Sequence, residues 1–168
     1  RPWTHQNFDN NPDHFQFAIV GDRTGQARPG IFEKGIAKLN LLRPEFVMSV
    51  GDLIEGYSKD ERDIDQQWDE FQGFTSKLDA PFFYVPGNHD LANPLQKQKW
   101  QDRFGAAYYD FVYRGVLFLA VNTYDPESHI SEKQIEFIRD SLARHKDARW
   151  ICVFMHEPLW DYKFETGW

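Results

Sequence analysis

Apolar runs alternate with amphipathic stretches through the first half of the chain. The runs at 15–20, 46–50 and 82–85 each end at a polar turn that contains glycine, which is typical of buried strands that lead into loops. Between these runs, residues 31–42 and 64–78 carry apolar side chains at helical spacing. The pattern therefore predicts the order strand, helix, strand, helix, strand.

The second half of the chain predicts a short helix, a hairpin, and a final helix and strand. Residues 95–104 favour the short helix, and the apolar runs 108–113 and 116–121 flank an Arg-Gly pair that is typical of a tight hairpin turn. A Ser-x-x-Gln capping box begins a helix over 131–145, and the apolar run 150–155 predicts the last strand.

This order indicates an α/β layered fold with a sheet that is mainly parallel at its start. The polar residues 1–14 precede it and predict a loop or a loosely docked N-terminal arm. Ligands of such sheets gather at the carboxyl ends of the strands. The polar side chains at those ends are Asp22, Asp52, Asn88, His89 and His156.

Composition limits the classes of partner. The 168 residues carry a formal charge of −7, which argues against nucleic acid as a main partner, although metal ions can give an acidic protein a local phosphate site. No apolar stretch reaches the roughly 18 residues that a membrane helix needs. Because Cys152 is the single cysteine, an internal disulfide is excluded, and its place in an apolar run predicts a small buried hydrophobic residue. The chain begins at Arg1, and the compartment stays open between the cytoplasm and export after removal of a signal peptide.

Each polar residue at a strand end has an ordinary structural explanation when it is taken alone. A Gly-Asp pair after a strand favours a turn or a helix cap, and a lone histidine such as His156 favours a satisfied core residue. The joint pattern is different, because four strands end in carboxylate, amide or imidazole groups. Such oxygen and imidazole donors suit Mn, Fe or Zn ions.

The motifs at these strand ends resemble those of the calcineurin-like metallophosphoesterases in order and spacing. The resemblance extends from residue 15 to about residue 160, and Gly-Asn-His-Asp is its most specific part. It implies a layered α/β/β/α sandwich over residues 15–168, with the second sheet incomplete in this chain. The motifs are Gly21-Asp22-x-x-Gly25, Gly51-Asp52, Gly87-Asn88-His89-Asp90 and Met155-His156-Glu157-Pro158.

The resemblance implies a site for two divalent or trivalent metal ions of the Mn, Fe or Zn class. Such ions lie about 3.5 Å apart and clamp a phosphate and a bridging hydroxide, which is the nucleophile. Asp52 matches the carboxylate that bridges both metals, and Asp22 matches a ligand of the first metal. Asn88 and His156 match ligands of the second metal.

Two further residues of the Gly-Asn-His-Asp motif match catalytic groups. His89 matches the histidine that binds the substrate phosphate and protonates the leaving oxygen. Asp90 could hold the imidazole of His89 in position. The implied activity is the hydrolysis of phosphomonoesters or phosphodiesters, and the implied partner is a phosphate-ester substrate.

The chain departs from the family pattern in two places. Thr24 occupies the position of the histidine in the family's Asp-x-His motif, so the first metal is expected to bind weakly, while Arg23 or Thr24 could contact the substrate phosphate. The family's later Gly-His-x-His motif is absent. We therefore expect an N-terminal piece of a longer domain, inactive by itself, with apolar surface exposed on 116–121 and 150–155. The alternative function is a non-catalytic phosphoryl-binding or structural module that has lost one metal through Thr24.

Overall fold

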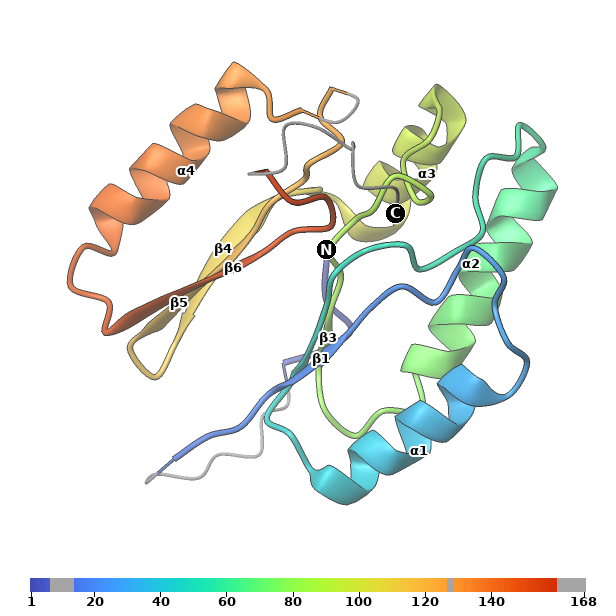
Figure 1. Ribbon diagram of the computed structural model, residues 1–168, viewed down its shortest axis with the longest axis horizontal. Helices are drawn as coiled ribbons and strands as arrows, with labels where there is room; N and C mark the ends of the chain where they lie inside the picture. Colours follow the sequence, from blue (N-terminus) through green and yellow to red (C-terminus); the bar gives the residue numbers. More distant parts are fainter. Residues whose placement is uncertain (7–13, 127–128, 160–168) are drawn as a thin grey trace.

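A computed structural model describes residues 1–6, 14–126 and 129–159 of the chain. The first sheet contains three parallel strands in the order β1-β2-β3. Helices α1, α2 and α3 lie together on one face of this sheet (Figure 1). The elements of this half are β1 (Ala18–Val20), α1 (Ile31–Leu42), β2 (Val47–Ser49), α2 (Glu61–Thr75), β3 (Phe82–Phe83) and α3 (Pro94–Phe104).

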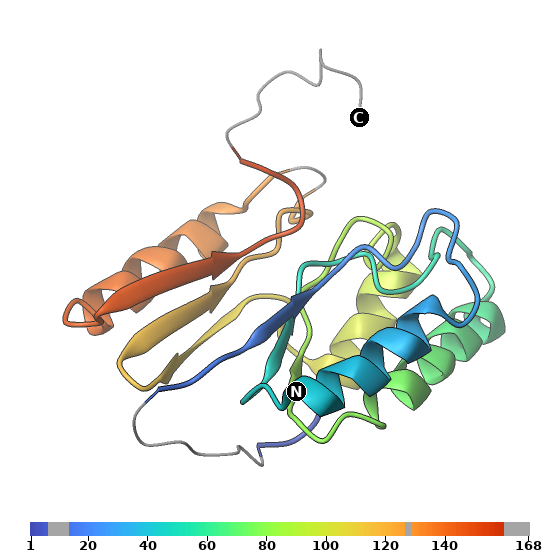
Figure 2. The ribbon, with the colours of Figure 1, turned by 60° about the horizontal axis from the view of Figure 1, so that its bottom comes forward.

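The second sheet has the order β4-β5-β6, in which β4 and β5 form an antiparallel hairpin and β6 runs parallel to β5. The hairpin turn at Arg114 and Gly115 has positive φ at both residues, which is the geometry that matches strand twist in a two-residue turn. Figure 2 shows α4 against the outer face of this sheet. The elements are β4 (Tyr109–Tyr113), β5 (Val116–Ala120), α4 (Glu132–Arg144) and β6 (Trp150–Phe154).

Strand alternation divides the core into two parts. On the first sheet, Val47 and Phe82 face the helices and pack with Trp68 and Trp100, while Phe46 and its neighbours face the second sheet. The cluster between the sheets is largely aromatic, and the contacts of Phe46 include a T-shaped contact with Phe118 at a centroid separation of 5.0 Å. The predicted layered α/β/β/α arrangement is confirmed.

The N-terminal residues pack more closely than a loose arm would. The amide of Thr4 donates to the carbonyl of Phe82 at 3.0 Å, and the amide of Tyr84 donates to the carbonyl of Pro2 at 2.8 Å. Trp3 pairs with β3 and packs against the cluster between the sheets. Residues 2–4 therefore form a loop that covers the free edge of β3, and the alternative of a loosely docked arm is wrong for them. Residues 7–13 lie outside the described residues.

The capping box before α4 forms only in part. The hydroxyl of Ser131 accepts from the amide of Gln134 at 3.3 Å, as predicted. The side chain of Gln134 does not return to Ser131 but bonds both the amide and the carbonyl of Asn122, at 2.7 and 2.8 Å. Gln134 is fully buried, so it joins the start of α4 to the end of β5.

The expected exposure of apolar strands is confirmed for β6 and wrong for β5. All five residues of β5 are buried, because this central strand has a strand on each side and the first sheet and α4 over its faces. On β6, Trp150 is 66% exposed, Ile151 47% and Val153 46%. Cys152, on the face of β6 opposite Ile151 and Val153, packs against the cluster between the sheets. Among the described residues, no helix is long and apolar enough to cross a membrane.

Candidate metal centre

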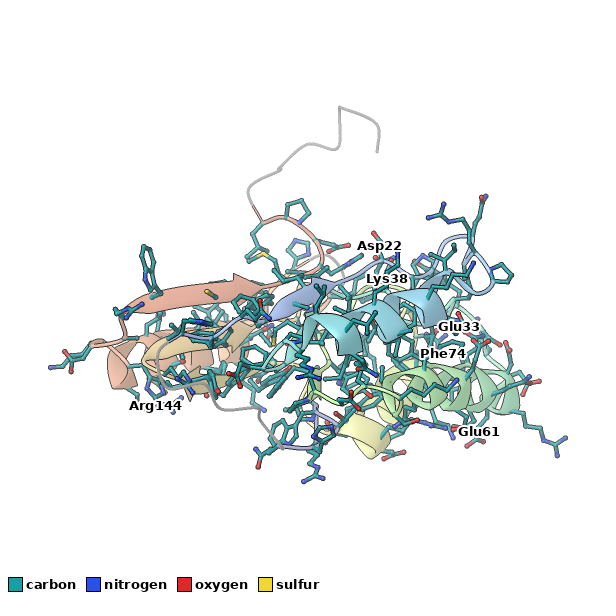
Figure 3. All side chains as sticks on the ribbon, turned by 90° about the horizontal axis from the view of Figure 1, so that it is seen from below. Asp22, Glu33, Lys38, Glu61, Phe74 and Arg144 are labelled. Carbon is teal, nitrogen blue, oxygen red and sulfur yellow. The ribbon has the colours of Figure 1, made fainter. Side chains whose placement is uncertain are left out.

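The loops after β1 and β2 bring two aspartates together. The amide of Asp22 donates to the carbonyl of Gly51 at 3.2 Å, and the amide of Arg23 donates to the carbonyl of Asp52 at 3.1 Å. Asp22 and Asp52 both have positive φ, a conformation that aspartate tolerates better than most residues. Figure 3 shows Asp22 just beyond β1. The two carboxylates therefore start from adjacent, hydrogen-bonded loops.

Asp52 lies between two histidines from other loops. Its Oδ2 atom is 3.2 Å from Nε2 of His156 and 3.8 Å from Nε2 of His89. Its Oδ1 atom accepts from the backbone amide of His89 at 3.1 Å. Burial raises the pKa of Asp52, but its hydrogen bond with His156 and the nearby histidine charges outweigh burial and lower it. Asp52 is thus held as a carboxylate at the centre of the site.

His156 presents one ring nitrogen to Asp52. Its Nδ1 atom is 2.9 Å from the carbonyl of Val50, which can only accept, so Nδ1 carries the proton and Nε2 faces Asp52. Burial lowers the pKa of His156, but the hydrogen bond and charge of Asp52 raise it to about 9, with a smaller contribution from Asp22. This nitrogen and the carboxylate oxygen therefore require a positive charge between them, which a proton or a metal ion can supply.

Two glycines of the motifs are required by close packing around this pair. A Cβ atom on Gly87 would lie 2.2 Å from Oδ1 of Asp52. A Cβ atom on Gly51, whose φ is +96°, would lie 2.8 Å from Nδ1 of His156. The glycines therefore allow the β2 and β3 loops to approach the acidic and imidazole side chains.

Tyr57 joins the site, although the sequence patterns did not single it out. Its hydroxyl accepts from Nδ2 of Asn88 at 2.7 Å, which leaves Oδ1 of Asn88 as the free ligand atom. The ring of Tyr57 contacts the ring of His89 edge to face, with centroids 4.7 Å apart. The only local signal was its place in the loop after β2, next to Gly56, where both residues have positive φ.

Asp90 supports the backbone of the site. It is fully buried and accepts from the amides of Leu53, Ile54 and Gly87, at 2.9, 3.2 and 2.8 Å. Burial is the largest effect on the pKa of Asp90 and raises it to about 7, against the opposing effect of the hydrogen bond from the Gly87 amide. The atom that meets Nδ1 of His89, at 2.7 Å, is the backbone carbonyl of Glu55. The expectation that Asp90 orients His89 is therefore corrected.

Arg23 and Thr24 have different environments. The guanidinium of Arg23 bonds Glu70 at 2.6 Å and lies 5.2 Å from the ring centroid of Phe74, both on α2. These contacts tie the loop to α2. The expected contact between Arg23 and the substrate stays a prediction. Thr24 is 9% exposed, and its buried hydroxyl has no hydrogen-bond partner among the described residues.

Comparison with known proteins identifies the family. The family model described as calcineurin-like phosphoesterase matches residues 4–167. The chain belongs to this family. Two curated relatives are the serine/threonine-protein phosphatase CPPED1 of Bos taurus, 28% identical over 178 residues, and a probable glycerophosphodiester phosphodiesterase, GpdQ, of Arcobacter nitrofigilis, 23% identical over 123 residues. The matches cover 95% and 69% of this chain but 52% and 42% of the relatives, so the chain spans about half the length of the curated relatives it matches.

Two solved structures with this fold belong to proteins that are described in different ways. A dimetal phosphatase from Danio rerio matches with a TM-score of 0.64 and 14% identity, over 86% of this chain and 70% of that one. GAP50, described as the anchor in the inner membrane complex of Plasmodium, matches with a TM-score of 0.61 and 20% identity, over 86% and 55%. At these identities the comparisons show the shared phosphoesterase fold.

The donor atoms at this site are of the chemical types that bind the metal ions of calcineurin-like phosphoesterases. Asp52 and His156 face each other as a carboxylate and an imidazole, and Asn88 adds a neutral oxygen, which are donors suited to Mn, Fe or Zn. Among the described residues, no three His, Cys, Asp or Glu side chains already form a metal cluster. The amide of Asn88 is a donor outside that set of residue types.

Proposed function

We propose that the protein hydrolyses phosphate esters at a centre for two metal ions built on Asp22, Asp52, Asn88 and His156. The observation that carries this proposal is the convergence on Asp52 of His156 at 3.2 Å and His89 at 3.8 Å, from loops far apart in the sequence. Family membership and the phosphatase and phosphodiesterase relatives support the same chemistry. When bound, the metal ions would supply Lewis-acid activation of the ester and of a water molecule.

The protein's own residues would position the ester and move the proton. The carbonyl of Glu55 holds the proton on Nδ1 of His89, so Nε2 is the nitrogen that can donate to the leaving oxygen. Oδ2 of Asp52 lies 3.8 Å from that nitrogen. Tyr57 fixes the amide of Asn88 with its oxygen presented as a ligand. Asp90 holds the two loops from which these side chains project.

We further propose that residues 15–168 belong to one metallophosphoesterase domain whose metal shell includes donors outside this chain. The family's Gly-His-x-His motif is absent from the 168 residues, and the exposed apolar face of β6 offers a surface for further structure. Under this proposal, residues 1–168 by themselves bind metal weakly and hydrolyse little, and the full-length protein is the active form.

Thr24 favours a second candidate function, a non-catalytic phosphoryl-binding or structural module. A hydroxyl is a poorer ligand than the imidazole that the family has at this position, and the Thr24 hydroxyl has no partner among the described residues. The likeness to GAP50 shows that the fold occurs in a protein described as an anchor as well as in a phosphatase.

The test measures hydrolysis of p-nitrophenyl phosphate and bis(p-nitrophenyl) phosphate by the full-length protein with Mn²⁺ and after exhaustive chelation. We expect activity only with metal. His89→Ala should lower kcat by ~10²–10⁴-fold with little change in metal content, because His89 acts as a proton donor and not as a ligand. His14→Ala, an exposed histidine outside the site, is the matched control.

Each outcome separates the two functions. Metal-dependent turnover that His89→Ala abolishes and His14→Ala preserves supports the hydrolase. Activity that survives chelation would contradict the metal mechanism. An absence of turnover with one bound metal ion, or none, would favour the non-catalytic module.

A further inference from the structure

A recess of about 450 Å³ lies between α3 and the segments that follow α3 and β5. Its size falls within the range of small-molecule sites, which is roughly 300–1,000 Å³. One face of α3 contributes Lys97, Trp100 and Gln101, which are spaced by three and four residues and so project on the same side. None of the side chains assigned to the metal centre lines this recess.

The chemistry of the recess is aromatic on its walls and basic near its edge. Trp100, Tyr108 and Tyr124 line it, and the small side chains of Ala106 and Ala107 leave its volume open. Trp100 is 1% exposed, and its buried Nε1–H has no acceptor among the described residues. Trp100 therefore contributes a buried aromatic wall to the recess.

Two lysines give this recess a positive character in an acidic protein of formal charge −7. Lys97 and Lys133 both line it and are exposed, and within the described part of the chain neither forms a salt bridge. The ammonium of Lys97 lies 5.7 Å from the ring centroid of Tyr124. One acidic residue, Asp125, also lines the recess, but its carboxylate accepts from the hydroxyl of Ser131 at 2.8 Å. Among the described residues that line the recess, the charged side chains therefore leave one net positive charge.

We propose that this recess binds a small aromatic anion, a function beyond ester hydrolysis at the metal centre. The ring of the ligand packs against Trp100, Tyr108 and Tyr124, and its acidic group faces Lys97 and Lys133. The apolar walls select the ring, and the lysines select the charge. A neutral compound of the same shape lacks the second interaction and binds more weakly.

The test measures, by titration calorimetry at pH 7, how tightly the protein binds 1-naphthoate and neutral 1-naphthol. We expect 1-naphthoate to bind several-fold more tightly, and its affinity to fall as NaCl is raised, because exposed charges are screened by salt. Lys97→Gln and Lys133→Gln should each weaken 1-naphthoate about two- to fivefold and leave 1-naphthol unchanged, since an exposed ion pair contributes about 0.2–1 kcal/mol.

Two further variants make the test specific. Lys34→Gln removes the same charge from an exposed position on α1, outside the recess, and should leave both affinities unchanged. Ala106→Trp adds a large side chain at an exposed position that lines the recess, and should block both compounds without disturbing the core. Equal binding of 1-naphthoate and 1-naphthol, equal loss in Lys34→Gln, or undiminished binding in Ala106→Trp would each overturn the proposal.

Discussion

Replacing Asp90 with alanine should destabilise the protein severely, although Asp90 is not a predicted metal ligand. Its buried carboxylate accepts three backbone amides, those of Leu53, Ile54 and Gly87. Each amide left without an acceptor in a buried position costs about 1–3 kcal/mol. Because the loops can relax toward water, we take the lower part of that range and expect a loss of about 3–5 kcal/mol. A domain of this size has roughly 5–15 kcal/mol of stability, so the loss is a large fraction of the total.

Equilibrium unfolding in urea, followed by far-ultraviolet circular dichroism, measures this loss. Asp90→Asn keeps one oxygen for Leu53 and Ile54 but places an amide nitrogen opposite the amide of Gly87, so we expect an intermediate loss of about 2 kcal/mol. Asp147→Ala, an exposed aspartate after α4, is the control and should change stability by less than about 0.5 kcal/mol. The reasoning is refuted if Asp90→Ala lies within about 1 kcal/mol of this control. If Asp90→Ala does not fold, Asp90→Asn gives the quantitative comparison.

Three further predictions concern the metal centre and the ion pair of Asp65 on α2 with Lys99 on α3. Tyr57→Phe should weaken Mn²⁺ binding, measured by calorimetry, about 2- to 12-fold, because it removes one hydrogen bond of about 0.5–1.5 kcal/mol that orients Asn88. In an Asn88→Asp background the same substitution should have no effect, because a carboxylate presents an oxygen on both sides. Thr24→His should tighten one of two Mn²⁺ sites, and unchanged titrations would place the Thr24 side chain away from the metal. Hydrogen bonds, of which the one from Lys99 has the largest effect, lower the pKa of Asp65 in the folded protein. These bonds therefore stabilise the fold at pH values above 3.8, the ordinary pKa of the group, and this stabilisation is lost as the pH falls below 3.8. Acid unfolding should therefore be shallower in Asp65→Asn, and identical profiles would contradict this sign.

The sequence by itself determined the order of the elements and the strand ends at which the candidate site is proposed. Apolar periodicity is a local property, so it identified the strands and helices and placed Asp22, Asp52, Asn88 and His156 at strand ends. The structure ends four of the six predicted strands one or two residues early. The Arg-Gly turn of the hairpin and the cap at Ser131 were also predictable, because turn and cap geometry depends on a few neighbouring residues.

Only the tertiary structure decided which atoms meet. The groups that hold His89 and His156 are the backbone carbonyls of Glu55 and Val50, and a carbonyl has no residue type that a motif can specify. His156 and Val50 are 106 positions apart. Asp90 illustrates the same limit, since its place in the motif suggested a side-chain partner while its position in the fold gave it three backbone amides.

The N-terminal residues show how packing overrides composition. A polar segment with proline predicts a loop, yet residues 2–4 pair with β3 because the free edge of that strand offers hydrogen bonds and the core accepts Trp3. The same reason explains β5 and β6, which have similar apolar sequences and opposite exposure. Burial depends on which neighbours the fold places beside a strand, and that information lies in segments distant along the chain.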